Sequence, residues 1–307
     1  MQKQKIKLVA IDLDDTLLRD DLTISQHSQE IIQEVRDEGV TVTLATGRML
    51  PSARPYAEQL GFDVPLITYQ GALVKNAFSG EVMYKCPLSE EVARLVIQYG
   101  RRKKIHVNFY MEDKLYVERI TPQGEHYERL SGVPFTKVED LEELMQDDFP
   151  FKLLLIDDEQ VVDQELDELR EILNEAGTDA HLSKSKPSYL EVNHPQATKG
   201  IALQKLAERL GVSREEVMAC GDSFNDLEML KYAGFGVAVA NAYPEIRSHA
   251  RYITASNNED GVALALQKLV LSGAEYHHGA LMNQCKGNRP QCIALRVVSF
   301  LGDVLLV

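Results

Sequence analysis

Short apolar runs alternate with amphipathic segments along the first 70 residues. Residues 7–11 are mostly aliphatic and predict a buried strand, and residues 40–45 and 65–69 predict two more. The amphipathic stretches between them predict helices at residues 25–38 and about 50–60, each followed by a glycine. This βαβαβ alternation is typical of an α/β fold with a doubly wound parallel sheet.

The alternation changes between residues 83 and 189. Amphipathic patterns predict helices at residues 89–104 and 161–176, and a short helix near residues 138–145 after a polar stretch. Strand-like runs occur at residues 105–110, 114–119, 151–156, 180–183 and 189–192. This order is typical of an antiparallel sheet with helices on one face, so we predict an α+β module here.

The parallel pattern returns after residue 190. Helices are predicted at residues 201–210 and 261–271, and strands at residues 217–220 and 236–239. The fold class is therefore α/β, with a parallel-sheet core that is interrupted by one inserted module.

These patterns divide the chain into three parts. Residues 1–82 and 190–272 form the core, residues 83–189 form the inserted module, and residues 273–307 are a C-terminal extension of unknown role. The end of the extension, residues 292–301, combines low charge with strong β-propensity. It either packs on the core as an extra element or is adventitious, for example read-through in another frame. We favour the second interpretation because none of the expected chemistry needs this segment.

Polar residues gather where the predicted core strands end. Asp12 and Asp14 follow the first strand, Thr46-Gly47-Arg48 follows the second, and Gly221-Asp222-Ser223-Phe224-Asn225-Asp226 follows a later one. In open α/β sheets, ligands bind at the carboxyl ends of the strands. Taken singly, each motif has a plainer interpretation: an acidic helix cap, a threonine N-cap, or, for Lys199, a solvated helix residue. Their occurrence together favours one common site.

This set of side chains suits phosphoryl transfer. Carboxylate oxygens are the ligands that Mg²⁺ prefers. Asp12 can bind the metal and attack phosphorus, while Asp222 supplies a further ligand and Asp226 orients the metal ligands. Asp14 can protonate the leaving oxygen and then deprotonate water. A hydroxyl, an ammonium and an amide can hold the remaining phosphoryl oxygens: Thr46, Lys199 and Asn225.

The motifs resemble, in order, those of the haloacid dehalogenase superfamily, specifically its Cof-type sugar-phosphatase-like branch. The resemblance covers residues 6 to about 271 and rests on four motifs: Asp12-Leu13-Asp14-Asp15-Thr16, Thr46-Gly47-Arg48, Lys199-Gly200 and Gly221-Asp222-Ser223-Phe224-Asn225-Asp226. It implies a Rossmann-like core and a large α/β cap inserted between the second and third motifs. The module at residues 83–189 is the expected cap.

The resemblance also implies roles for single residues. Asp12 would be the nucleophile, Asp14 the acid/base and a metal ligand through its backbone carbonyl, and Asp222 the third protein ligand of Mg²⁺. Five residues would bind the substrate phosphate: Leu13, Thr46, Gly47, Lys199 and Asn225. Four residues are candidates for substrate specificity: Arg48, Gly71, Ser188 and Tyr189. Two positions depart from the usual pattern, because Asp15 replaces Gly and Gln70 replaces Asn.

Composition limits the possible partners. A net charge of -14 opposes binding to nucleic acid or an anionic membrane, although a bound cation can still create a pocket for an anionic substrate. No apolar run approaches the roughly 20 residues that span a bilayer. Residues 1–5 leave no room for a signal peptide, and the four cysteines show no CxxC spacing. We expect a cytoplasmic monomer or weak homo-oligomer whose partner is a small-molecule phosphate ester.

The sequence therefore predicts a Mg²⁺-dependent phosphomonoester hydrolase that uses an aspartyl-phosphate and acts on small soluble phosphates, with sugar phosphates favoured. One alternative is a phosphotransferase or phosphomutase with the same nucleophile. Another is a pyridoxal-phosphate or flavin-pathway phosphatase. A receiver-type signalling module also collects Asp, Thr and Lys around Mg²⁺, but such modules are single domains of roughly 120 residues without an inserted cap.

Overall fold

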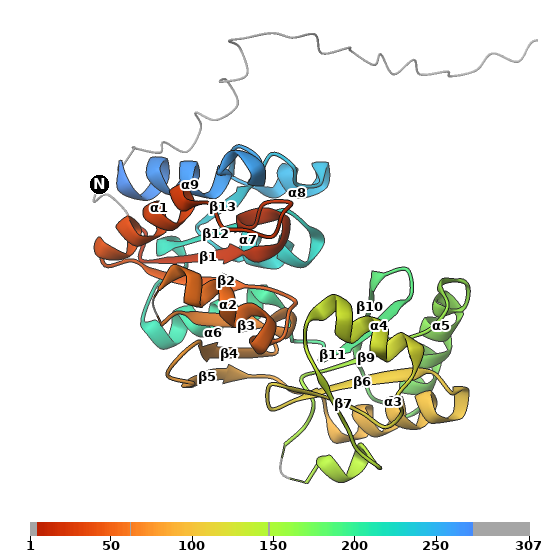
Figure 1. Ribbon diagram of the computed structural model, residues 1–307. Helices are drawn as coiled ribbons and strands as arrows, with labels where there is room; N and C mark the ends of the chain where they lie inside the picture. Colours follow the sequence, from red (N-terminus) through yellow and green to blue (C-terminus); the bar gives the residue numbers. More distant parts are fainter. Residues whose placement is uncertain (1–4, 62, 147, 273–307) are drawn as a thin grey trace, which may run out of the picture. The chain divides into compact units, whose positions relative to one another are not determined.

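Two sheets organise the part of the chain that the structure describes (Figure 1). This structure is a computed structural model, and it describes residues 5–61, 63–146 and 148–272. One sheet has eight strands and the other has six. The predicted α/β fold with a parallel-rich core sheet is confirmed, whereas the predicted C-terminal extension lies outside the described residues.

The eight-stranded sheet has a parallel centre and an antiparallel edge. Its parallel strands are, in spatial order, β14 (Tyr252–Ile253), β13 (Phe235–Ala238), β12 (Val217–Gly221), β1 (Leu8–Asp12), β2 (Thr41–Ala45) and β3 (Pro65–Thr68). Two antiparallel strands that the sequence analysis did not predict extend the sheet beyond β3: β4 (Leu73–Asn76) and β5 (Val82–Lys85). The boundary placed between residues 82 and 83 therefore falls within β5.

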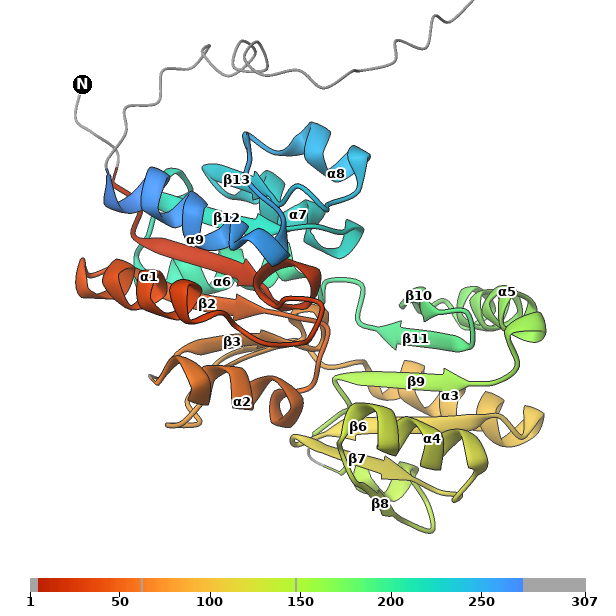
Figure 2. The same ribbon diagram turned by 45° about the horizontal axis from the view of Figure 1, so that its top comes forward.

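Helices cover both faces of this sheet (Figure 2). One face carries α1 (Gln26–Asp37), α2 (Leu50–Leu60) and α9 (Gly261–Leu266), and the other carries α6 (Lys199–Leu210) and α7 (Leu227–Tyr232). A short helix, α8 (Pro244–His249), follows β13. Helix α6 has clear local signals at both ends. The Thr198 hydroxyl accepts the backbone N–H of Ile201, and Gly211 ends the helix in the left-handed conformation. Lys199 is consequently the first residue of α6.

The central strands explain where the polar motifs meet. All five residues of β1 and all five of β12 are buried, which accounts for their nearly uninterrupted apolar sequences. The two strands are parallel, and Ile11 lies beside Cys220. Asp12 and Asp222 therefore emerge at the same edge of the sheet.

The six-stranded sheet is antiparallel apart from one pair of strands. Its spatial order is β10 (His181–Lys186), β11 (Tyr189–Asn193), β9 (Lys152–Ile156), β6 (His106–Met111), β7 (Lys114–Val117) and β8 (Phe135–Lys137), with β7 and β8 parallel. Helices α3 (Glu90–Lys103) and α5 (Glu159–Glu175) pack on one face, against an apolar cluster that includes Phe109, Leu155 and Val192. The boundary placed between residues 189 and 190 falls within β11.

Helix α4 (Pro122–Ser131) corrects the prediction for the polar stretch. Its Tyr127 packs with the apolar residues on the opposite face of the six-stranded sheet from α3 and α5, so helices lie on both faces and not on one. The end signals of α4 are present in the sequence, since Thr121 caps it and Gly132 ends it. Only Gly124 is buried along α4, however, so it lacks the apolar stripe that predicts a helix.

The short helix predicted near residues 138–145 is wrong in type and length. The structure has a single 3-10 turn there, Glu142–Leu144. The carboxylate of Glu142 pairs with Arg94 and Arg101 of α3, so ion pairs hold this turn where a helix was expected to bury an apolar face.

Glu165 of α5 is a buried acid that makes stability depend on pH. Burial, and next a hydrogen bond with Asp157, raise the pKa of Glu165 from 4.5 to about 7. Folding therefore takes up a proton between these values, and stability is lost as the pH rises through 7. We expect Glu165→Gln to raise Tm by roughly 1–3 °C at pH 8.5 and by less at pH 5. Thermal unfolding at the two pH values measures this difference, and equal shifts would contradict it.

Candidate active site

One ammonium and two carboxylates meet at the carboxyl ends of β1 and β12. Lys199 Nζ lies 2.6 Å from Asp12 Oδ1 and 2.7 Å from Asp226 Oδ1. The three side chains are buried, with exposed fractions of 1% for Lys199, 6% for Asp12 and 0% for Asp226. A buried charge of this kind persists only when partners compensate it. Lys199 is therefore part of the site and not a solvated residue of α6.

Asp222 adds a third carboxylate to this cluster. Ligand oxygens of Asp12, Asp222 and Asp226 all lie within 4.8 Å of one another. Asp222 accepts a hydrogen bond from Thr16 Oγ1 at 3.1 Å. Asp226 accepts the backbone N–H groups of Asp222 and Ser223 at 3.0 Å each. These bonds orient the carboxylates before any ligand binds.

The electrostatics of the cluster leave negative charge uncompensated. Burial raises the pKa of Asp12 well above its ordinary value, and the neighbouring Asp226 raises it further. Burial and then Asp226 also raise the pKa of Asp222 to about 6. Burial alone would lower the pKa of Lys199, but Asp12 and Asp226 raise it above its usual value, so the ammonium stays charged. Three hard carboxylates facing one ammonium could hold a divalent cation.

Asp14 and Arg48 form an ion pair beside the cluster. Arg48 Nη2 lies 2.5 Å from Asp14 Oδ1, and Nε lies 2.9 Å from Oδ2, so the guanidinium grips the carboxylate with two groups. The Arg48 guanidinium also lies 5.2 Å from the ring centroid of Tyr56. The Arg48 backbone N–H donates to Thr46 Oγ1 at 3.1 Å, and Leu13 is buried directly after Asp12.

The segment after β3 reaches the same site. Gly71 has φ +113°, and a Cβ there would lie 2.2 Å from the Thr198 carbonyl oxygen, so only glycine allows the chain to approach the start of α6. The preceding Gln70 accepts a hydrogen bond from Asn225 Nδ2 at 3.1 Å. The sequence analysis did not count Gln70 as a site residue. The available signal was its position as a polar residue at a core strand end, the rule that identified Asp12 and Thr46.

Two predicted specificity residues, Ser188 and Tyr189, lie just before and at the start of β11. Tyr189 is the first residue of β11 and packs against Tyr127 of α4, with ring centroids 5.8 Å apart. The Ser188 carbonyl accepts the backbone N–H of Asp157. Within the described part of the chain, neither residue hydrogen-bonds to the four motifs, and their role in specificity stays a prediction.

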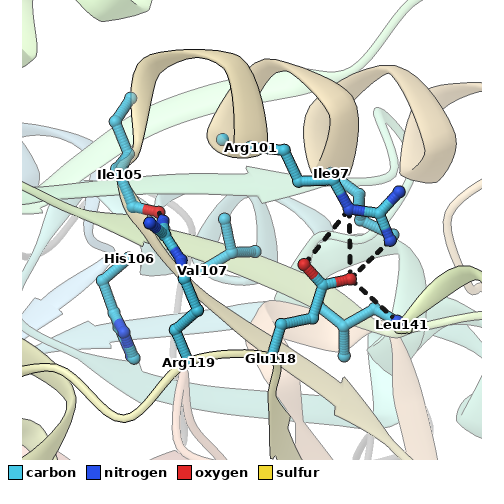
Figure 3. A pocket seen from close by; sticks show the side chains of 9 residues that line it. Ile97, Arg101, Ile105, His106, Val107, Glu118, Arg119 and Leu141 are labelled. Atoms are coloured by element: carbon cyan, nitrogen blue, oxygen red, sulfur yellow. Dashed lines mark hydrogen bonds and ion pairs between the residues drawn. The ribbon is translucent and has the colours of Figure 1, made fainter. Parts of the chain in front are cut away.

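Two cavities differ greatly in size. A cavity of about 260 Å³ lies beside the Arg48–Asp14 pair, and its lining residues are Arg48, Pro51, Ser52, Pro55, Tyr56, Ser131, Gly132, Val133 and Pro134. The other, between α3 and the strands β6 and β7, has about 10 Å³ and contains the Arg101–Glu118 ion pair (Figure 3). That volume holds about one water molecule, so this second cavity admits no phosphate ester.

Comparison with known proteins agrees with this arrangement. Residues 9–266 match the haloacid dehalogenase-like hydrolase family. The chain belongs to this family. It is 35% identical over 266 residues to the 5-amino-6-(5-phospho-D-ribitylamino)uracil phosphatase YcsE of Bacillus subtilis, and the match covers 87% of this chain and 96% of that protein. The family resemblance identified from the four motifs is thus confirmed.

Solved structures of this hydrolase family share the fold. TM0651 from Thermotoga maritima superposes with a TM-score of 0.78 at 33% identity, covering 85% of this chain and 97% of that one. The subclass IIB sugar phosphatase BT4131 superposes with a TM-score of 0.68 at 23% identity, covering 85% of this chain and 98% of that one. The protein is accordingly a haloacid dehalogenase-like phosphatase that hydrolyses phosphate esters. None of its described helices is long and apolar enough to cross a membrane.

Proposed function

We propose that this phosphatase is a Mg²⁺-dependent phosphomonoesterase that acts on small phosphorylated sugars and sugar alcohols through an aspartyl-phosphate on Asp12. The observation that carries the proposal is the buried contact of Asp12 with Lys199, beside Asp222 and Asp226. The name of the relative YcsE supports the substrate class, because its substrate carries a phosphorylated ribityl chain.

Mg²⁺ would be held by the carboxylates of Asp12 and Asp222 and by the backbone carbonyl of Asp14. Bound there, it would supply the positive charge that the buried cluster lacks and that a phosphoryl group needs. Asp226 would keep Lys199 and the backbone after Asp222 in place through its hydrogen bonds. The donor set fits, since all of these ligands are hard oxygen atoms.

The side chains of this site then have distinct tasks. A carboxylate oxygen of Asp12 attacks phosphorus, and the bond from phosphorus to the ester oxygen breaks. Asp14 gives its proton to that leaving oxygen and afterwards takes a proton from water. The water oxygen attacks phosphorus, the bond to Asp12 breaks, and inorganic phosphate leaves. Four other groups would hold the phosphoryl oxygens with Lys199: the residues Leu13, Thr46, Gly47 and Asn225.

The cavity of about 260 Å³ would receive the leaving group. Arg48, the partner of Asp14, lines it, with α2 on one side and residues 131–134, at and after the end of α4, on the other. Pockets for drug-sized ligands range over roughly 300–1,000 Å³, so this cavity suits a smaller molecule. Arg48 would contact the leaving group here after it releases Asp14. We propose that the six-stranded part, from the end of β5 to the end of β11, serves as the cap.

A panel of phosphate esters tests the substrate and the metal together. We expect inorganic phosphate release from several hexose, pentose and sugar-alcohol phosphates with modest selectivity. Removal of divalent metal with EDTA should abolish the activity, and Mg²⁺ should restore it, because the cluster lacks a balancing cation. Strict preference for a nucleotide or a phosphoprotein would contradict the substrate class. Full activity in EDTA would contradict the metal.

A further inference from the structure

We propose that Gln70 is a positioning residue of the phosphoryl site, which acts by holding the carboxamide of Asn225 in place. The proposal rests on the proposed function, because it assigns the phosphoryl oxygens to Asn225. Gln70 belongs to none of the four motifs, and its role follows from contacts that its backbone and its side chain make separately.

The backbone around Gln70 is attached to two motifs. Its N–H donates to the Thr46 carbonyl at 3.2 Å, and the Tyr69 N–H donates to the Arg48 carbonyl at 2.9 Å. On the other side, Gly71 lies against the carbonyl of Thr198, directly before Lys199. The segment 69–71 therefore lies between the loop that contains Thr46 and the start of α6, and it contacts both of them.

The side chain of Gln70 extends this bridge to a third motif. Its Oε1 accepts the Asn225 Nδ2–H at 3.1 Å. Its Nε2 occupies the space beside Gly47, where a Cβ would lie only 2.5 Å away. A larger residue at position 47 would push the Gln70 carboxamide away from this place. One carboxamide thus lies against Gly47 and hydrogen-bonds to Asn225.

The side chain of Asn225 is exposed, so its orientation depends on the few hydrogen bonds that it makes. Its Oδ1 accepts the Ser223 hydroxyl at 2.6 Å, and its Nδ2 donates one N–H to Gln70. The two contacts fix both ends of the amide, and they leave a second N–H for a phosphoryl oxygen. Without Gln70, the Asn225 amide could rotate, and its donor would spend less time in the productive orientation.

The backbone conformation separates this role from a purely structural one. Gln70 has φ +60° and Tyr69 has φ +52°, a region that glycine and asparagine adopt far more readily than glutamine does. A position that served only to turn the chain would be better filled by glycine. A glutamine stands here despite this conformation, which favours a contribution from the side chain itself.

Gln70→Gly tests the proposal, because glycine suits the backbone and removes only the amide. We expect Tm to stay constant or rise by about 1–3 °C, while kcat/KM for a sugar phosphate falls by roughly 10- to 100-fold. Competitive inhibition by inorganic phosphate, the product, should weaken in parallel. Gln70→Asn keeps a carboxamide on a shorter side chain and should recover part of the loss. Gln33→Ala, which removes an exposed glutamine of α1, is the control and should behave as wild type.

A double-mutant cycle with Asn225→Ala shows whether the two residues act as a unit. If Gln70 acts through Asn225, the double variant should be no less active than Asn225→Ala alone. Wild-type activity of Gln70→Gly, or losses that multiply in the double variant, would overturn the proposal. The proposed function has its own test in Asp12→Asn, so an inactive Asp12→Asn with a fully active Gln70→Gly would refute only the positioning role.

Discussion

Asp12→Asn should lower kcat by about 10³-fold or more, to the limit of detection for a sugar phosphate. An amide is a poor nucleophile, and it carries no negative charge toward a cation. The substituted side chain has nearly the same shape, so the loss would reflect chemistry and not packing. Release of inorganic phosphate at saturating substrate and Mg²⁺ measures the effect.

The same change should leave the fold intact. Lys199 keeps its contact with Asp226 at 2.7 Å, so its buried charge remains compensated. Asn at position 12 also removes repulsion, since Asp226 and Asp222 both act to raise the pKa of Asp12. We therefore expect the Tm of this variant to lie within a few degrees of that of the wild type, which corresponds to a change of about 1 kcal/mol in the free energy of unfolding.

Asp15→Asn is a matched control in the same motif. Asp15 is exposed and has φ +59°, a conformation that asparagine tolerates well. We expect this variant to keep activity within about twofold of the wild type, because the side chain is exposed and the backbone carbonyl, which Asn241 holds, is unchanged. Substantial turnover by Asp12→Asn would exclude Asp12 as the nucleophile. Equal losses in both variants would show that the loop, and not the Asp12 carboxylate, matters.

The central fold could be predicted because strands that are buried on both faces have recognisable apolar sequences. Strands β1 and β12 are buried on both faces, so their apolar runs are distinct, and the parallel arrangement then places Asp12 and Asp222 at one edge. Lys199 was harder to interpret, because a lysine at a helix start is usually solvated. Only the pairing of β1 with β12 and the position of α6 bring its Nζ within 2.6 Å of Asp12.

Elements without an apolar pattern escaped prediction. Strand β5 has no buried residue, and α4 buries only Gly124, so neither has the periodicity that marks an element in sequence. Gln70 was noted as a departure from the family pattern but was given no role, for another reason. Its side chain hydrogen-bonds to Asn225, a contact between segments more than 120 residues apart. The local sequence pattern does not indicate contacts between segments so far apart.

The role of Ser188 and Tyr189 in substrate specificity stays a prediction. The sequence placed Ser188 and Tyr189 where the inserted module rejoins the core. In the structure, the strand β11 separates them from Lys199 along the chain. The cavity next to Arg48 is lined by residues of α2 and by residues at and after the end of α4, an element that was not predicted. A pocket between two parts of a chain depends on how their surfaces meet, which the periodicity of either part does not encode.

Asp14→Asn should lower kcat/KM for a sugar phosphate by about 10²- to 10⁴-fold but change kcat/KM for p-nitrophenyl phosphate by less than about tenfold. An alkoxide leaves only with a proton, whereas nitrophenolate leaves without one. The parameter kcat/KM reports the transfer to Asp12, so the later need for Asp14 as a base does not enter it. That later step should instead appear as a burst of nitrophenolate followed by slow turnover. In the structure, the Arg48 guanidinium also pairs with the Asp14 carboxylate, at 2.5 Å and 2.9 Å. The effect of losing this ion pair therefore has to be separated from the effect of losing the proton donor.

Asparagine cannot form that ion pair, but the pair is partly exposed and contributes at most about 1 kcal/mol to stability, so Tm should change little. Arg48→Lys is the control that weakens the ion pair and leaves the Asp14 carboxyl group in place, because lysine keeps the charge but cannot form the bidentate contact. This variant should keep the wild-type ratio of kcat/KM between the two esters, which Asp14→Asn changes. An equal loss of kcat/KM for both esters in Asp14→Asn would show that Asp14 binds or orients the substrate and is not the general acid.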